Sequence, residues 1–83
     1  MRIEETKKAI KAYILEEFLS GEDPEALTDS IPLLTGGIMD SINTLKLVAF
    51  LEERFQIEIE PHETAVDFMN TISEIAALVH SKL

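Results

Sequence analysis

Apolar residues recur near helical spacing in three segments of the chain, residues 3–19, 41–55 and 72–81. A period of about 3.6 residues predicts amphipathic helices that bury one face and expose the other. Ser20 and Gly21 follow the first segment as a helix stop. The pattern therefore predicts three major helices.

A shorter apolar segment, residues 64–69, precedes the last helix and predicts a short helix or helical turn. Thr71 and Glu74 then match a capping box, the arrangement that begins a helix. We expect three side chains of the short segment to enter the core: Val66, Phe68 and Met69.

Two connections separate these helices. Residues 20–40 form a long loop with two prolines and a Gly36-Gly37 pair, and its length favours an ordered or functional loop. Residues 56–61 alternate polar and apolar, but an isolated strand has no partner, so we expect an extended loop ended by Pro61. Apolar residues of the long loop are expected to anchor it to the core: Ile31, Leu33, Leu34 and Ile38.

The predicted fold is all-α: a small four-helix bundle with three major helices, a short third helix and a long loop between helices 1 and 2. At 83 residues the chain forms one domain, residues 1–83, with a single core. The longest apolar runs have five residues, well below the about 20 that span a bilayer. The N-terminus has no apolar signal segment, so we expect a cytoplasmic monomer without membrane insertion.

The net charge of −9 is concentrated in one part of the chain. Residues 1–21 hold four basic and four acidic groups, whereas residues 22–83 hold three basic and twelve acidic groups. Such a surface repels nucleic acid and attracts basic protein patches. Solubility alone is the simpler explanation of the same charge.

Candidate catalytic chemistry is sparse. The chain has no cysteine, and it contains no His-Glu-x-x-His motif or glycine-rich phosphate loop, so we expect no metal site. A serine hydroxyl is a poor nucleophile without a base. His62 and His80 do not stand at a triad spacing from Ser41, and we expect both on the surface. We predict that the protein is not an enzyme.

The second helix carries apolar residues on two opposite faces. With residues placed 100° apart, a core stripe comprises Thr44, Leu47, Val48, Leu51 and Phe55. The opposite face carries a second apolar group: Ile42, Leu45 and Ala49. In one explanation the loop of residues 20–40 buries this group, or its members are scattered surface residues of no special role. In the other explanation the group is a contact surface for partner proteins with charges at its rim. The rim residues are Lys46, Glu52 and Glu53.

The Gly-Gly pair leads into Asp40-Ser41, and either residue can cap the second helix. The positive end of a helix dipole favours a phosphate group, so Ser41 is well placed to carry one. The segment that follows, with Leu47, Leu51, a Glu-Glu pair and a closing Phe55, resembles the attachment segment of the acyl carrier proteins.

This resemblance implies a bundle of acyl-carrier type with 4′-phosphopantetheine on Ser41. It implies a phosphopantetheinyl transferase that uses coenzyme A and Mg²⁺, with Asp40 as the helix cap of the motif. The arm would hold acyl or aminoacyl groups as thioesters and deliver them to downstream biosynthetic enzymes. Because tethering raises local concentration, the carrier supplies delivery and its partners supply the chemistry.

The chain departs from fatty-acid carriers in its second helix, where Asn43, Lys46 and Arg54 stand among the expected acids. Residues 63–72 are closer to D-alanyl and stand-alone peptidyl carrier proteins, which favours loading by a discrete adenylate-forming ligase. Two other hypotheses remain: an acidic helical adaptor that binds a protein through the second-helix face, and a small hydrolase that uses Ser41.

Overall fold

The computed structural model describes residues 2–18 and 27–83. Within these ranges every regular element is helical: α1 (Ile3–Glu17), α2 (Ser41–Phe55), the 3₁₀ helix η2 (Pro61–Thr64), α3 (Val66–Met69) and α4 (Ile72–Lys82). The all-α prediction and the three major helices are confirmed. The predicted stop at Ser20 and Gly21 lies outside the described residues.

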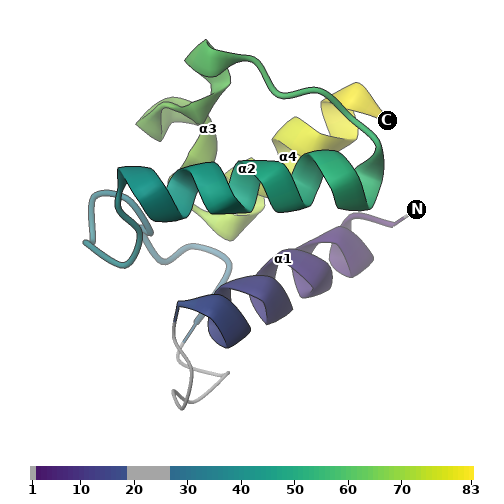
Figure 1. Ribbon diagram of the computed structural model, residues 1–83. Coiled ribbons are helices and arrows are strands. Elements are labelled where there is room, and N and C mark those ends of the chain that lie inside the picture. Colours follow the sequence, from purple (N-terminus) through teal and green to yellow (C-terminus); the bar gives the residue numbers. More distant parts are fainter. Residues whose placement is uncertain (1, 19–26) are drawn as a thin grey trace.

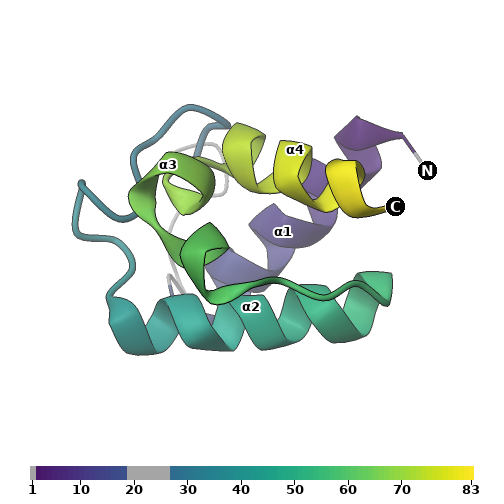
Figure 2. The same cartoon turned by 90° about the horizontal axis from the view of Figure 1, so that it is seen from above.

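The helices form a bundle of 30 × 26 × 20 Å. α2 lies along one side, while α1 and α4 pack against each other across the core (Figures 1 and 2). The short helix α3 packs on α4 and on η2. The ends of α1 and α4 that carry the chain termini lie side by side, at the end of the molecule away from the start of α2 (Figures 1 and 2).

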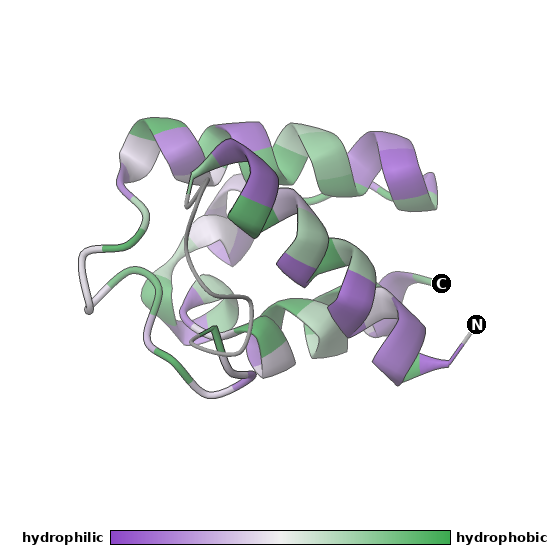
Figure 3. Ribbon diagram, turned by 90° about the horizontal axis from the view of Figure 1, so that it is seen from below, coloured by the Kyte–Doolittle hydropathy of each residue, from purple (hydrophilic) through white to green (hydrophobic). Residues whose placement is uncertain are grey.

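The core draws on the predicted apolar stripes. Along α1 and α2, hydrophobic and hydrophilic residues alternate with the turn of the helix (Figure 3). Thr44, Leu47, Leu51 and Phe55 of α2 are buried as expected, and Val48 is half-buried. The fully buried side chains of α1 and α4 are Thr6, Ile10, Ile14, Ile72, Ile75, Ala76 and Val79.

Aromatic side chains join α1 to α2. The Tyr13 ring stacks on Phe50 with centroids 4.2 Å apart, and its hydroxyl donates a hydrogen bond to the Lys46 carbonyl at 3.2 Å. Phe18 meets the edge of Tyr13 at 5.7 Å. These contacts hold α2 at a fixed place relative to α1, and thereby position the start of α2.

The connection after α2 is extended, as predicted, and it is held by α2 itself. Gln56 adopts a left-handed conformation (φ 55°) that ends the helix. The Glu52 carboxylate accepts a hydrogen bond from the Ile59 N–H at 2.9 Å, and Ile59 is buried. The 3₁₀ helix that follows was not predicted. Glu60 and Glu63 form its capping box around Pro61.

The short third helix is present, but two of its expected core residues are not buried. Val66 is 45% exposed and Phe68 is 39% exposed, whereas Met69 is fully buried. A helix of four residues makes little more than one turn, so it turns a single face to the core. The prediction that Val66 and Phe68 enter the core was therefore wrong.

The start of α4 confirms the Thr71 cap. The Glu74 N–H donates to the Thr71 hydroxyl at 3.1 Å, and this hydroxyl donates to the Glu74 carboxylate. At the other end of α4, Lys82 forms an ion pair with Glu63 of η2 at 2.7 Å. The hydrogen bond from Lys82 lowers the pKa of Glu63. α4 is thus fixed at both ends.

Candidate functional site

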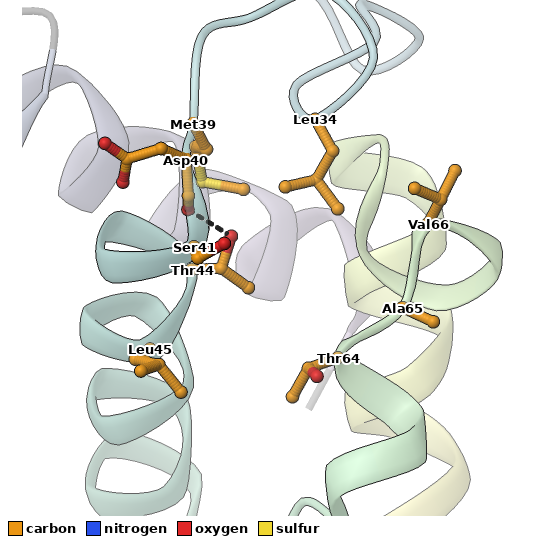
Figure 4. Close-up of a pocket in the computed structure, with 9 residues that line it drawn as sticks. All are labelled: Leu34, Met39, Asp40, Ser41, Thr44, Leu45, Thr64, Ala65 and Val66. Carbon is orange, nitrogen blue, oxygen red and sulfur yellow. Dashed lines mark hydrogen bonds between the residues drawn. The ribbon is translucent and has the colours of Figure 1, made fainter.

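The start of α2 presents Ser41 to solvent. Asp40 is the N-cap: its Oδ1 accepts a hydrogen bond from the Asn43 N–H at 2.8 Å. Its carbonyl oxygen accepts a bond from the Thr44 hydroxyl at 2.7 Å (Figure 4). Ser41 is the first helical residue and is exposed. Of the two predicted caps, Asp40 takes the role, which leaves the Ser41 side chain outside the capping interaction.

A tight turn directs the chain into this helix. The Leu33 carbonyl accepts hydrogen bonds from the N–H groups of Ile38 and Met39, both at 2.9 Å. A Cβ on Gly36 would overlap the Pro32 carbonyl oxygen, and Gly37 has a φ of +79°. Both positions therefore favour glycine, for steric and conformational reasons respectively. The Gly-Gly pair serves the turn, as predicted.

The long loop is anchored less uniformly than expected. Leu33 is fully buried, while Ile31, Leu34 and Ile38 are half-buried against the core. Met39, which was not among the expected anchors, is also buried. It immediately precedes Asp40, so the backbone is fixed to the core one residue before the cap.

A groove of about 520 Å³ runs beside Ser41 (Figure 4). One wall is the first turns of α2, and the opposite wall is the segment from η2 to α3 (Figure 4). The lining is mostly apolar, and most of its polar groups lie near the start of α2. The residues that line the groove are Leu34, Met39, Asp40, Ser41, Thr44, Leu45, Thr64, Ala65 and Val66. The exposed position of Val66, which was predicted wrongly, is explained by its place in this wall.

The outer face of α2 is open to solvent. Ile42 is 66% exposed and Leu45 is 63% exposed, and Ala49 and Lys46 are also exposed. Burial by the long loop is therefore excluded, which leaves scattered surface residues or a contact surface. Of the predicted rim acids, Glu53 is exposed, whereas Glu52 is half-buried and engaged with Ile59.

The two histidines do not contribute to the groove. His62 is exposed in η2, with its Nδ1 3.6 Å from a Glu60 carboxylate oxygen. His80 was predicted to be a surface residue, but it is half-buried, and its Nε2 lies 2.7 Å from the hydroxyl of the buried Thr6. Within residues 2–18 and 27–83, no group of acidic or histidine side chains could hold a metal ion. None of the described helices is long and apolar enough to cross a membrane.

The site fits a phosphopantetheine arm. It offers an exposed hydroxyl at a capped helix N-terminus, where the dipole favours a phosphodiester, and an adjoining groove of mostly apolar lining. Residues 10–79 match the family model described as the phosphopantetheine attachment site. The chain belongs to this family of carrier proteins, and phosphopantetheine is its cofactor.

Relatives of this chain include D-alanyl carrier proteins. The protein from Streptococcus sanguinis (strain SK36) is 37% identical over 68 residues, which cover 80% of this chain and 85% of the relative. The protein from Lactococcus lactis subsp. cremoris (strain MG1363) is 35% identical over 66 residues, covering 80% and 84%. The predicted nearness to D-alanyl carriers is confirmed.

A solved peptidyl carrier protein has the same fold. The structure titled "Structure of KstB-PCP(apo)" aligns with a TM-score of 0.70 at 26% identity, and covers 96% of this chain and 88% of that chain. The similarity extends over nearly the whole described structure. The predicted bundle of acyl-carrier type is therefore confirmed.

Proposed function

We propose that Ser41 is the residue that carries 4′-phosphopantetheine. The observation that supports this most directly is the exposure of Ser41 at the N-terminus of α2, beside the groove. A phosphodiester there would lie at the positive end of a 15-residue helix. Asp40 holds that end in place by accepting the Asn43 N–H, so the attachment point is rigid in the backbone.

Activation of the hydroxyl must come from another protein, because neither histidine lines the groove. A phosphopantetheinyl transferase with Mg²⁺ would take the Ser41 proton on its own base. The new bond joins the serine oxygen to the phosphorus of the arm, and the adenosine part of coenzyme A leaves as its bisphosphate. In this proposal the chain has no catalytic activity of its own.

We propose that the cargo is an aminoacyl group, held as a thioester on the arm and loaded by a discrete adenylate-forming ligase. The D-alanyl carrier relatives and the peptidyl carrier fold support an amino acid over a long acyl chain. The groove is mostly apolar and can shelter the arm between α2 and α3. Since loading by the ligase needs ATP and installation of the arm needs coenzyme A, we place the protein in the cytoplasm, acting as a monomer.

Partner enzymes would bind the outer face of α2. Ile42, Leu45 and Ala49 form an exposed apolar strip that starts next to Ser41. Lys46 and Glu53 lie on the same face and supply charges of both signs, with Glu52 at its edge. Apolar contacts surrounded by charges are the usual composition of a protein interface. Downstream biosynthetic enzymes would use the same face in turn.

Mass spectrometry after incubation with a promiscuous transferase and coenzyme A tests the attachment. We expect one added phosphopantetheine in the wild type and none in Ser41→Ala, with unchanged helix content because Asp40 keeps the cap. The matched control is Ser30→Ala, another exposed serine, which should be modified like the wild type. Modification of Ser41→Ala, or an unmodified wild type beside a working control carrier, would refute the proposal.

Leu45→Glu tests the partner face. A charge in the apolar strip should lower loading of the phosphopantetheine form by a D-alanine-activating ligase about tenfold or more, since the central anchors of an interface are worth about 2 kcal/mol or more. Leu83→Glu is the control, because Leu83 is similarly exposed (59%) but follows α4 and lies outside the apolar strip. The adaptor hypothesis predicts instead that the wild type is not modified and that only protein binding responds to Leu45→Glu.

A further inference from the structure

Asn70, which follows α3, binds the loop that leads to Ser41. Its backbone carbonyl accepts a hydrogen bond from the Leu33 N–H. Its side-chain Oδ1 accepts bonds from the N–H groups of Leu34 and Thr35, both at 3.0 Å. Its Nδ2 donates to the Thr35 hydroxyl at 3.3 Å. One residue thus attaches three consecutive loop residues to the junction of α3 and α4.

Two of these three loop residues, Leu33 and Leu34, hold the entry to α2. The Leu33 carbonyl accepts the N–H groups of Ile38 and Met39, and the Leu34 carbonyl accepts that of Gly37. Met39 directly precedes the Asp40 cap. A continuous set of hydrogen bonds therefore runs from Asn70 through the turn to the residue before the cap, although Asn70 does not line the groove.

We propose that Asn70 is a positioning residue for the modification of Ser41. It fixes the turn of residues 33–39, and with it the approach to Ser41 that the transferase must recognise. Ordering a loop residue has a cost in conformational entropy, so without this anchor the turn would populate other conformations as well. The apparent affinity of the transferase then falls with the populated fraction of the ordered turn. This inference rests on the proposed attachment at Ser41.

Three variants test it in steady-state transferase kinetics. Asn70→Leu removes the acceptor, and we expect KM for the carrier to rise about fivefold or more with kcat nearly unchanged, because one net hydrogen bond corresponds to about a fivefold change in an equilibrium constant. Asn70→Asp keeps oxygens for both N–H groups and should stay within about twofold of the wild type. Val79→Ala destabilises the core of α4 without touching these bonds and should leave KM unchanged well below its unfolding temperature.

Amide hydrogen exchange provides a readout that does not depend on modification. We expect Asn70→Leu to lose protection at Ile38 and Met39, whose N–H groups donate to Leu33 and not to Asn70, while amides in α4 stay protected. Should Asn70→Leu not fold, Asn70→Ser replaces it, since the shorter side chain cannot reach both N–H groups. Unchanged exchange at Ile38 and Met39 together with unchanged KM would overturn the inference.

An unmodified wild type would refute the attachment at Ser41, and with it the role of Asn70 in modification. The exchange data would still decide whether Asn70 orders the turn.

Discussion

At the scale of single residues, two neighbours at the start of α2 have different roles. Asp40 caps the helix, so the Ser41 side chain is not needed for capping. The sequence predicts that a helix begins here, because Asp and Ser are both strong N-cap residues and glycines precede them, but it does not indicate which of the two caps the helix. Asn70 could not be anticipated, since its partners Leu34 and Thr35 are 36 and 35 positions away in the chain. Nothing local to Asn70 indicates them.

Two variants of Asp40 test the cap by itself. Asp40→Ala should lower the free energy of unfolding by about 1 kcal/mol through loss of the cap, whereas Asp40→Asn keeps an acceptor for the Asn43 N–H and should cost only a few tenths. Urea unfolding followed by circular dichroism measures both. If the two variants lose equal stability, the carboxylate charge and not the cap is what matters.

At the scale of elements, helices are held together by polar contacts that periodicity does not reveal. The long helices were predicted within a few residues because each carries a clear apolar stripe. The exposure of Val66 and Phe68 was missed because four residues are too few to show a stripe. The pair of Thr6 and His80 was missed because it joins α1 to α4 across 74 positions of the chain.

The contact between α1 and α4 predicts a stability effect at a buried hydroxyl. Thr6→Val keeps the shape of the side chain but removes the partner 2.7 Å from the His80 Nε2, and should cost about 1–2 kcal/mol. Thr6→Ser keeps the hydroxyl and loses one methyl group, which tests packing alone. Denaturant unfolding should rank the wild type above both variants. Thr6→Val as stable as the wild type would show that the hydrogen bond has no net value.

At the scale of the whole molecule, charge and size act together. A net charge of −9 is carried by a molecule whose longest dimension is 30 Å. At 0.01 M salt the screening length is also about 30 Å, so all the acidic groups repel one another. At 1 M it is about 3 Å, and only neighbours interact. The folded state should gain from salt, because unfolding spreads the charges apart.

We expect the melting temperature to rise by about 4 °C or more between 0.01 M and 0.5 M KCl, the shift that about 1 kcal/mol produces in a domain of this size. Glu58→Gln removes one exposed acidic group and should reduce the salt response. Thermal unfolding by circular dichroism measures both. A melting temperature that does not change with salt would mean that local ion pairs, such as the one between Lys82 and Glu63, already compensate the charge.

The neighbouring outer ends of α1 and α4 have a practical consequence. They lie at the far end of the molecule from Ser41, which begins a helix about 22 Å long (Figures 1 and 2). An affinity tag, a fluorescent fusion or a sensor-chip linkage added at either end would therefore leave the serine and the exposed strip of α2 pointing outward. Either way of immobilising the protein would present the same surface to a partner in solution.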